Sequence, residues 1–296
     1  MAGSATARKL FGRLGPRGLF GVVVLVVFVF AVLIGPLFQP GASRSQSLVD
    51  RLLPPLSTKA DGSLALLGTD QLGRDLVFEI LLGGRVSLLV GLCTLVFAGI
   101  FGVVFGAVGA YRGGRLDSVV MRVADIQLAF PSVILAILIA AVLGPSVTNV
   151  IITLSISRWV AFARIARGQV LSLKQAEYVS SARLMGVPGA RILFVHILPG
   201  AAMPLLIVAT MEFGLVILNE ASLSFLGLGV PGDGISWGLT ISQGRDYLGT
   251  AWWISTLPGI ALALLMVGVG TLGDELRDRF DPHLRVGDNA SAPAAV

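Results

Sequence analysis

Two carboxylates inside one apolar run are the first residues whose chemistry stands out. Glu212 and Glu220 lie in the run 200–221, and Asn219 lies beside the second of them. Carboxylates within a membrane-spanning helix are costly, so they commonly mark a path for an ion, a proton or a polar solute. For Glu212, a protonated carboxyl that only makes hydrogen bonds is the simpler alternative. We interpret Glu220, near the end of the run, as a structural or gate residue.

A second run, 147–165, is the least hydrophobic of the runs that are long enough to cross a membrane. It carries Asn149 and Thr153 together with other hydroxyl side chains and an arginine. A helix this polar does not face lipid all round. It therefore either lines an aqueous cavity, such as a translocation path, or packs in the centre of a helix bundle. The sequence leaves both interpretations open.

The groups that enzymes need are missing. The sequence has three lysines, Lys9, Lys59 and Lys174, and none follows a glycine, so there is no Gly-x-x-x-x-Gly-Lys phosphate loop. Its two histidines and its single cysteine, Cys93, are isolated from other metal-ligating groups. We expect no cofactor or metal in this chain and no enzyme activity of its own. If the chain drives uphill transport, a partner must supply the energy.

Membrane helices must position these residues. Of the 296 residues, 55% are hydrophobic and 13% are charged, and the mean hydropathy is +0.87. The net charge of +5 is typical of basic residues retained on the cytoplasmic side, so we expect no nucleic-acid partner. We predict an all-α membrane protein with six transmembrane helices, at 19–38, 87–110, 120–143, 147–165, 200–221 and 252–272.

Charge asymmetry predicts the orientation. Basic residues dominate the N-terminal tail 1–18 and the segment 158–198, which has Glu177 as its one acidic residue. Both should be cytoplasmic, and six spans then place the C-terminus there too. The charges of 39–86 and 222–251 show no positive excess, so these segments should lie outside. The predicted organisation is a cytoplasmic tail, a first span 19–38, an extracytoplasmic segment 39–86, a five-helix core 87–285 and a disordered tail 286–296.

Capping residues and prolines predict further local structure. We expect a short surface helix over 76–82 capped by Thr69 or Asp70, a helix start capped by Asp117 or Ser118, and a kink at Pro131.

The segment 172–199 is a polar insert between two spans, and its pattern predicts two short helices. Ser172 and Gln175 form a capping box, Gly186 stops the first helix, Pro188 begins the second and Pro199 ends it. On pattern alone, this segment could be an amphipathic connector on the membrane surface.

The same segment resembles a cytoplasmic loop of ATP-binding-cassette importer permeases. The family pattern has a Glu-Ala-Ala-like start, a glycine nine residues later and an Ile-x-Leu-Pro-like end, which here are Glu177, Gly186 and 197–199. Tyr178 and Val179 stand where the pattern has alanines, a variant typical of the dipeptide, oligopeptide and nickel branch. Further motifs resemble the same branch and its "C" type subunit: Gly68–Asp75, Asp125 to Pro131, Glu220–Gly229, Ser236–Gly238 and the stretch from Gly273.

This resemblance implies the type I importer permease fold, in the bacterial cell membrane, and import of dipeptides or oligopeptides. Nickel or another small solute is the alternative within the family. The implied partners are a second, different permease, two ATPase subunits or domains that bind ATP and Mg²⁺, and an extracytoplasmic binding protein. The loop would dock on the ATPases through residues 177–186, namely Glu177, Tyr178, Val179, Ala182, Arg183, Leu184, Met185 and Gly186. An ion-coupled secondary transporter that uses Glu212 is the alternative from a different class, and it predicts an internal repeat that the sequence does not show.

Overall fold

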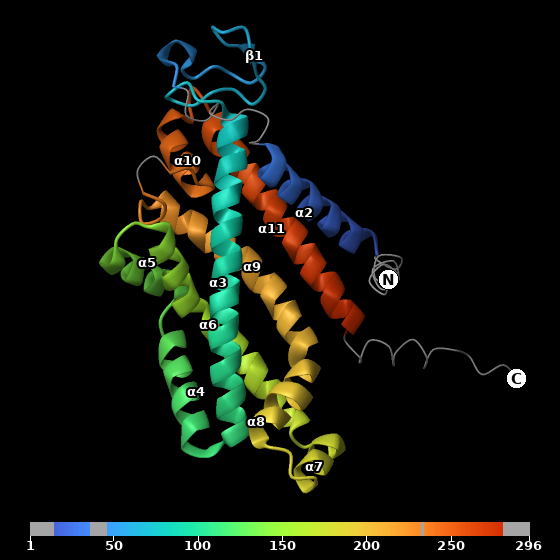
Figure 1. Ribbon diagram of the computed structural model, residues 1–296. Helices are drawn as coiled ribbons and strands as arrows, with labels where there is room; N and C mark the ends of the chain where they lie inside the picture. Colours follow the sequence, from blue (N-terminus) through green and yellow to red (C-terminus); the bar gives the residue numbers. More distant parts are fainter. Residues whose placement is uncertain (1–14, 36–45, 232–233, 281–296) are drawn as a thin grey trace, which may run out of the picture.

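The computed structural model describes residues 15–35, 46–231 and 234–280. The expected tail 286–296 and residues 1–14 of the expected N-terminal tail lie outside the described residues. Within them the chain is mostly helical, with one two-stranded sheet (Figure 1). The prediction of an all-α membrane protein is confirmed.

Among the described residues, five helical stretches are long and apolar enough to cross a membrane. They are α2 (Pro16–Ile34), α3 (Leu76–Arg112), α6 (Val147–Leu173), the stretch Gly189–Phe225 that ends in α9 (Ala202–Phe225), and α11 (Trp253–Phe280). The predicted third span is not one continuous helix. Its two halves, α4 (Gly114–Leu128) and α5 (Ser132–Leu143), meet at 91°.

Pro131 explains the break, which is much sharper than the predicted kink. Proline has no N–H to continue the helical ladder, and it stands directly before α5. The predicted capping of α4 by Asp117 or Ser118 is wrong. The chain turns at Gly113, whose φ is +68°, and α4 begins at the next residue.

The start of α3 also differs from the prediction. The expected surface helix over 76–82 is the beginning of this 37-residue helix. Its cap is Asp75, which accepts a hydrogen bond from the Val77 N–H at 3.0 Å. Thr69 and Asp70 do not cap it, because both side chains hold the preceding loop. Asp70 accepts from the Arg74 N–H at 2.7 Å, and Thr69 accepts from the Leu53 N–H at 2.9 Å.

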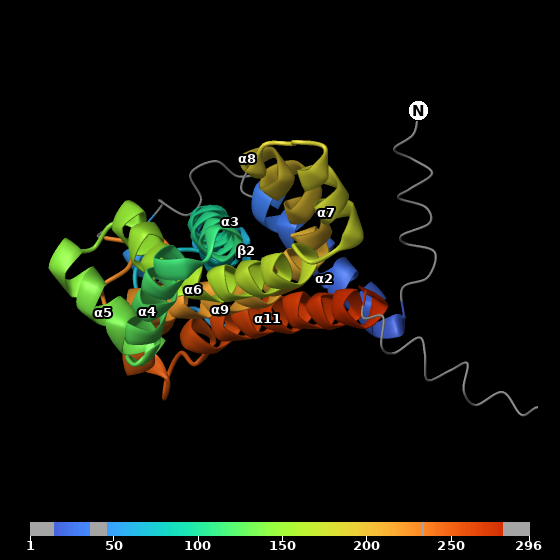
Figure 2. The same cartoon turned by 90° about the horizontal axis from the view of Figure 1, so that it is seen from below.

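Small residues allow the long helices to pack closely. Gly102 and Gly106 of α3 contact the backbone of α6 at Trp159 and Ala163, where a Cβ atom would not fit. The helix α2 lies along α11 (Figures 1 and 2), and Glu275 of α11 accepts a hydrogen bond from the Gly15 N–H at 3.1 Å. This bond ties the start of the first span to the end of the last.

A small cap stands at the N-terminal end of α3. We call residues 46–75 the hairpin cap. It contains η2 (Leu48–Asp50) and the antiparallel strands β1 (Ser57–Thr58) and β2 (Leu64–Ala65). Below it lie α10 (Trp237–Gly244) and η5 (Arg245–Tyr247). Trp253 at the start of α11 donates from Nε1 to the Thr69 carbonyl at 3.1 Å, which fastens the cap to the bundle.

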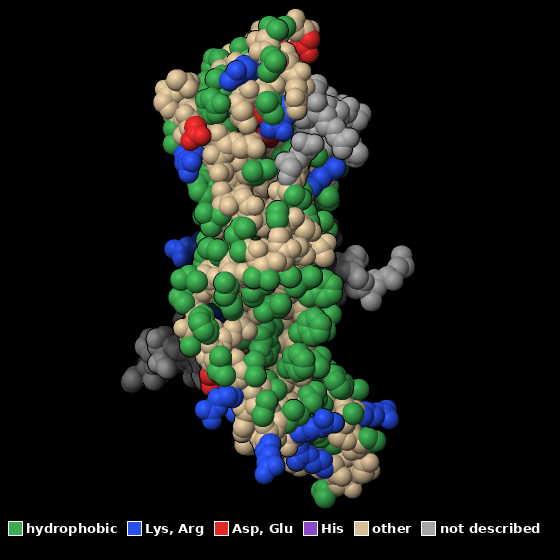
Figure 3. Space-filling model, turned by 90° about the vertical axis from the view of Figure 1, so that its left-hand side faces the viewer, with side chains coloured by type: hydrophobic (Ala, Val, Ile, Leu, Met, Phe, Trp, Pro, Cys, Tyr) green, Lys and Arg blue, Asp and Glu red, His purple; other side chains and the backbone are tan. Residues whose placement is uncertain are grey.

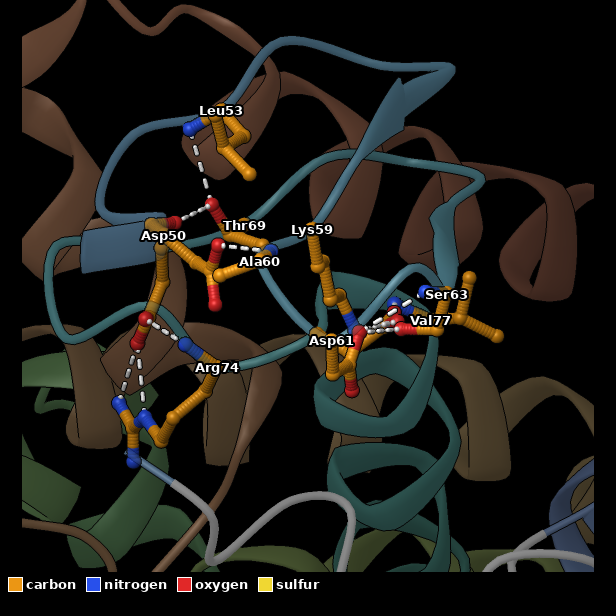
Figure 4. Close-up of polar contacts among 11 residues, drawn as sticks. Asp50, Leu53, Lys59, Ala60, Asp61, Ser63, Thr69, Arg74 and Val77 are labelled. Atoms are coloured by element: carbon orange, nitrogen blue, oxygen red, sulfur yellow. Dashed lines mark hydrogen bonds and ion pairs between the residues drawn. The ribbon is translucent and has the colours of Figure 1, made fainter. Parts of the chain in front are cut away.

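Largely buried polar contacts hold the cap in one shape (Figure 4). Asp50 accepts from the Ala60 N–H at 2.7 Å, Lys59 pairs with Asp75 at 2.6 Å, and Arg74 pairs with Asp70 at 2.7 Å. Ion pairs shielded from solvent lose more when one partner is removed than exposed pairs do. The cap is therefore a preorganised unit whose conformation is fixed by its own contacts.

Candidate coupling site

The predicted coupling segment forms the end of the molecule opposite the hairpin cap (Figure 1). It contains α7 (Glu177–Leu184), α8 (Gly189–Arg191), a π-helical turn η3 (Ile192–Ile197) and a 3-10 turn η4 (Leu198–Ala201), which leads into α9. Two short helices are present, as predicted. The capping box is wrong: Ser172 is still within α6, and Ala176 precedes α7.

Gly186 ends α7 by a Schellman motif. Its N–H donates to the Arg183 carbonyl at 2.9 Å, and the Val187 N–H donates to the Ala182 carbonyl at 3.1 Å. The φ of Gly186 is +74°, a region that L side chains rarely adopt. The predicted helix stop is confirmed.

Pro199 does not end the second helix. It lies in the first turn of η4, where the missing N–H is tolerated, and the chain stays helical through η3 and η4 into α9. The loop is therefore joined to the fifth span by continuous helical structure. A displacement of the loop would therefore also move α9, because continuous helical structure joins the two.

One face of α7 is buried against the rest of the chain. Val179 and Ala182 are 0% and 2% exposed. They belong to a cluster contributed by α3, α6 and η3: Ala107, Ala110, Ala166, Val170, Ile192, Leu193 and Ile197. This chain therefore already buries the Val179 and Ala182 side chains, which support α7 from within, and docking of the segment on the ATPases stays a prediction.

The opposite face of α7 carries exposed apolar side chains. Leu184 is 90% exposed, Met185 76% and Tyr178 46%. The other residues predicted to dock, Glu177, Arg183 and Gly186, are also exposed. An apolar tip on a short helix with a fixed inner face can insert into a groove of another protein.

Polar contacts fix the base of this loop, and sequence reasoning missed them. The Arg183 guanidinium lies over the Tyr111 ring, 5.8 Å from its centroid, and the Lys174 Nζ donates to the Ala110 carbonyl at 3.2 Å. Arg167 of α6 and Asp117 of α4 form a two-pronged pair at 2.7 and 2.8 Å. No local motif predicts pairs this far apart along the chain.

Basic side chains gather around the same end. Figure 3 shows Lys and Arg side chains below a broad apolar belt. The exposed arginines near the loop and the α3–α4 corner include Arg112, Arg115, Arg122, Arg164 and Arg191. A concentration of arginine beside a membrane span is typical of a cytoplasmic face.

Glu212 lies in the middle of α9 and has a partner that sequence reasoning missed. Its Oε2 is 3.4 Å from the Arg158 Nη1 of α6, and the two side chains are 12% and 13% exposed. The partner comes from the polar run predicted to line a path or pack centrally. This pairing offsets part of the free-energy cost of placing two charged groups within a membrane. A role of Glu212 in a translocation path stays a prediction.

Glu220 and Asn219 are buried near the C-terminal end of α9. The Glu220 carboxylate accepts from Ser87 Oγ at 2.7 Å and from Ser224 Oγ at 2.8 Å. Ser87 belongs to α3, so this cluster joins two spans. Glu220 was interpreted as either a structural residue or a gate residue, and these contacts favour the structural role.

Asn149 and Thr153 have different surroundings. The Asn149 amide donates to the carbonyls of Leu143 and Gly144 at 2.8 and 3.1 Å, so it stabilises the turn between α5 and α6. The Thr153 side chain is fully buried. Burial of Thr153 shows that this face of α6 packs within the chain, whereas Ile152 and Ile156 on the same helix are 42% and 45% exposed. A role of Asn149 or Thr153 in a path stays a prediction.

The comparisons with known proteins identify the class. Residues 98–286 match the family described as "Binding-protein-dependent transport system inner membrane component". The chain belongs to this family. It is a multi-pass membrane permease of a bacterial ATP-binding-cassette (ABC) importer.

Its relatives place the chain among the DppC/OppC-like members. A protein of Brucella suis, named as a candidate permease of a peptide transport system, is 43% identical over 95% of this chain and 92% of its own length. The di/tripeptide transport system permease protein DppC of Pseudomonas aeruginosa is 38% identical over 90% of this chain and 88% of its own. The oligopeptide transport system permease protein OppC of Bacillus subtilis is 36% identical over 90% and 85%.

A solved structure has the same fold. A chain of the methionine ABC transporter MetNI, in an inward-facing conformation, aligns with a TM-score of 0.57 at 18% identity, over 69% of this chain and 97% of that chain. The type I importer permease fold, which the sequence resemblance implied, is confirmed.

Proposed function

We propose that this chain is one of two different permease subunits of an ATP-driven importer of dipeptides or oligopeptides. The names of its relatives support the peptide substrate. The partners are a second permease, two ATPase subunits or domains that bind ATP and Mg²⁺, and an extracytoplasmic binding protein. The chain itself carries no ATPase site. The segment 172–199 and both termini face the cytoplasm.

The observation that carries this proposal is the two-faced helix α7. Its inner face is locked to α3, α6 and η3, while Leu184 and Met185 project from its tip. Nucleotide binding closes the ATPases and displaces α7. Because the segment is joined to α9 and packed on α3 and α6, those spans tilt with it. The two states of the permease then differ in their affinity for the nucleotide-bound ATPases.

ATPase activity of the assembled complex tests the function. The complex, reconstituted in lipid with its own binding protein, is given dipeptides, longer peptides or nickel. We expect peptides to stimulate ATP hydrolysis and nickel to have no effect. Stimulation by nickel alone would refute the peptide assignment, and peptide uptake by this chain without ATPases would refute the class of transporter.

A further inference from the structure

One ion pair joins the two spans that flank the coupling segment. Arg158 lies near the middle of α6, and Glu212 lies near the middle of α9. The helix α6 leads into the segment 172–199, and α9 leads out of it (Figure 1). No other hydrogen bond or ion pair links α6 to α9 within the described part of the chain. Among polar contacts, this pair alone therefore bears on the angle between the two spans.

The contact within this pair is weak for the groups that form it. Arginine and a carboxylate commonly share two parallel hydrogen bonds of about 2.7–2.9 Å. The pair at the base of the loop does so, whereas Arg158 and Glu212 share one contact at 3.4 Å. The buried Arg158 Nε has no hydrogen-bond partner among the described residues, which is costly at this depth. Apolar side chains at both positions would stabilise the bundle at least as well, so stability does not account for the pair.

The contacts between α6 and α4 are closer. The Gln127 Nε2 of α4 donates to the carbonyls of Ile156 and Ser157 at 2.8 and 3.1 Å. Its Oε1 accepts from the Trp159 Nε1 at 2.8 Å. These contacts fix to α4 the turn of α6 that carries Arg158, and the two-pronged pair at the base of the loop adds a second connection. We therefore expect α4 and α6 to move as one body, with α9 free to move relative to them once the Arg158 contact is lost.

We infer that Arg158 and Glu212 form a latch, which holds α6 and α9 together in the resting permease and opens when the coupling segment is displaced. This inference rests on the proposed function, in which the ATPases displace that segment. A contact that is already 3.4 Å long is lost when the helices separate slightly further. The pair thus stabilises the resting state relative to the displaced state. It lowers ATP hydrolysis in the absence of peptide, because nucleotide binding must break it.

Basal ATPase activity of the complete complex in lipid tests the latch. Glu212→Gln keeps the size of the side chain and removes its charge. It should raise ATP hydrolysis without binding protein about fivefold and reduce the further stimulation by peptide-loaded binding protein. Exchange of the two residues, Arg158→Glu with Glu212→Arg, should restore a low basal rate. Asp125→Asn is the control, because it breaks an ion pair between α6 and α4 and leaves α9 unaffected, so its basal rate should not change.

The alternatives predict different results. An unchanged basal rate in Glu212→Gln, in a complex that assembles with normal yield, overturns the inference. A basal rate that Asp125→Asn raises equally also overturns it, because the effect is then not specific to the contact with α9. A purely structural role predicts a lower melting temperature with an unchanged rate per complex. A direct contact with peptide predicts a higher KM for uptake with an unchanged basal rate, and both of these patterns contradict the latch.

A crosslinking measurement tests the same inference if the charge variants assemble poorly. Cysteines replace Arg158 and Glu212 in a Cys93→Ser background, and a short bifunctional thiol reagent is added to the complex. The latch predicts efficient crosslinking without nucleotide and a several-fold lower yield with a non-hydrolysable ATP analogue and loaded binding protein. Equal yields overturn the inference. If peptide-loaded binding protein does not stimulate the unmodified complex, the proposed function fails, and the crosslinking yields still show whether ATP separates α6 from α9.

Discussion

Replacement of Gly186 by alanine should uncouple ATP hydrolysis from transport. Gly186 has φ +74°, and a Cβ added there would meet nothing within 4 Å. The cost is therefore purely conformational, about 1–2 kcal/mol for an L residue in this region. A strain of about 1 kcal/mol lowers the population of the native loop end about fivefold relative to unwound alternatives. Asparagine, which tolerates positive φ better, should have a smaller effect.

A matched control separates loop geometry from general destabilisation. Gly144, between α5 and α6, has φ +79° and also has nothing within 4 Å of an added Cβ. We expect Gly186→Ala to lower peptide transport per ATP hydrolysed several-fold in proteoliposomes. Gly144 has a ψ of 167°, which together with its φ places it in a region that is essentially restricted to glycine, so Gly144→Ala is at least as strained. It should nevertheless leave this ratio unchanged, and Gly186→Asn should have a smaller effect than Gly186→Ala. Equal ratios for the two alanine variants would refute the special role of the loop end.

Three further predictions concern contacts at the loop base and within the bundle. Arg167→Ala should destabilise the complex by about 0.5 kcal/mol because the pair is partly exposed, and exchanging the charges of Arg167 and Asp117 should restore part of the loss of thermal stability. Glu220→Leu should lower the free energy of unfolding by about 1–3 kcal/mol, because it leaves two buried hydroxyl groups without their acceptor. In detergent, its melting temperature should therefore lie below that of Glu220→Gln. Equal melting temperatures would contradict the contacts described. Gly238→Ala should lower the yield of folded protein, because the new Cβ would collide with the Ala221 carbonyl, whereas Gly249→Ala meets no neighbour and should be neutral.

Local signals predicted part of this structure correctly. Hydropathy located the spans because crossing a bilayer requires about 20 apolar residues whatever the neighbours are. Gly186 was predictable because a helix stop depends on backbone conformation alone. Pro131 was predictable as an irregularity, but the 91° angle depends on how α5 packs, which no local pattern encodes.

Several of the wrong predictions arose because other side chains or backbone groups compete for the same residue. Asp70 and Asp75 are equally good capping residues by type. The Asp70 carboxylate instead binds Arg74 and backbone N–H groups of the loop, so Asp75 is the residue that caps α3. The face that α7 buries depends on the cluster from α3 and α6, so sequence alone grouped Val179 with Leu184. Arg158 and Glu212 are 54 residues apart, and their pairing follows only from the packing of α6 on α9.

Site-specific photo-crosslinking tests the central claim most directly. A photoreactive amino acid replaces Met185, which is 76% exposed at the tip of α7, or Leu64, which is 50% exposed at the opposite end of the molecule. Illumination of the assembled complex should join position 185 to an ATPase subunit and should join position 64 to none. If position 185 crosslinks to no ATPase in an intact complex, the segment 172–199 is not where the energy of ATP hydrolysis enters this permease.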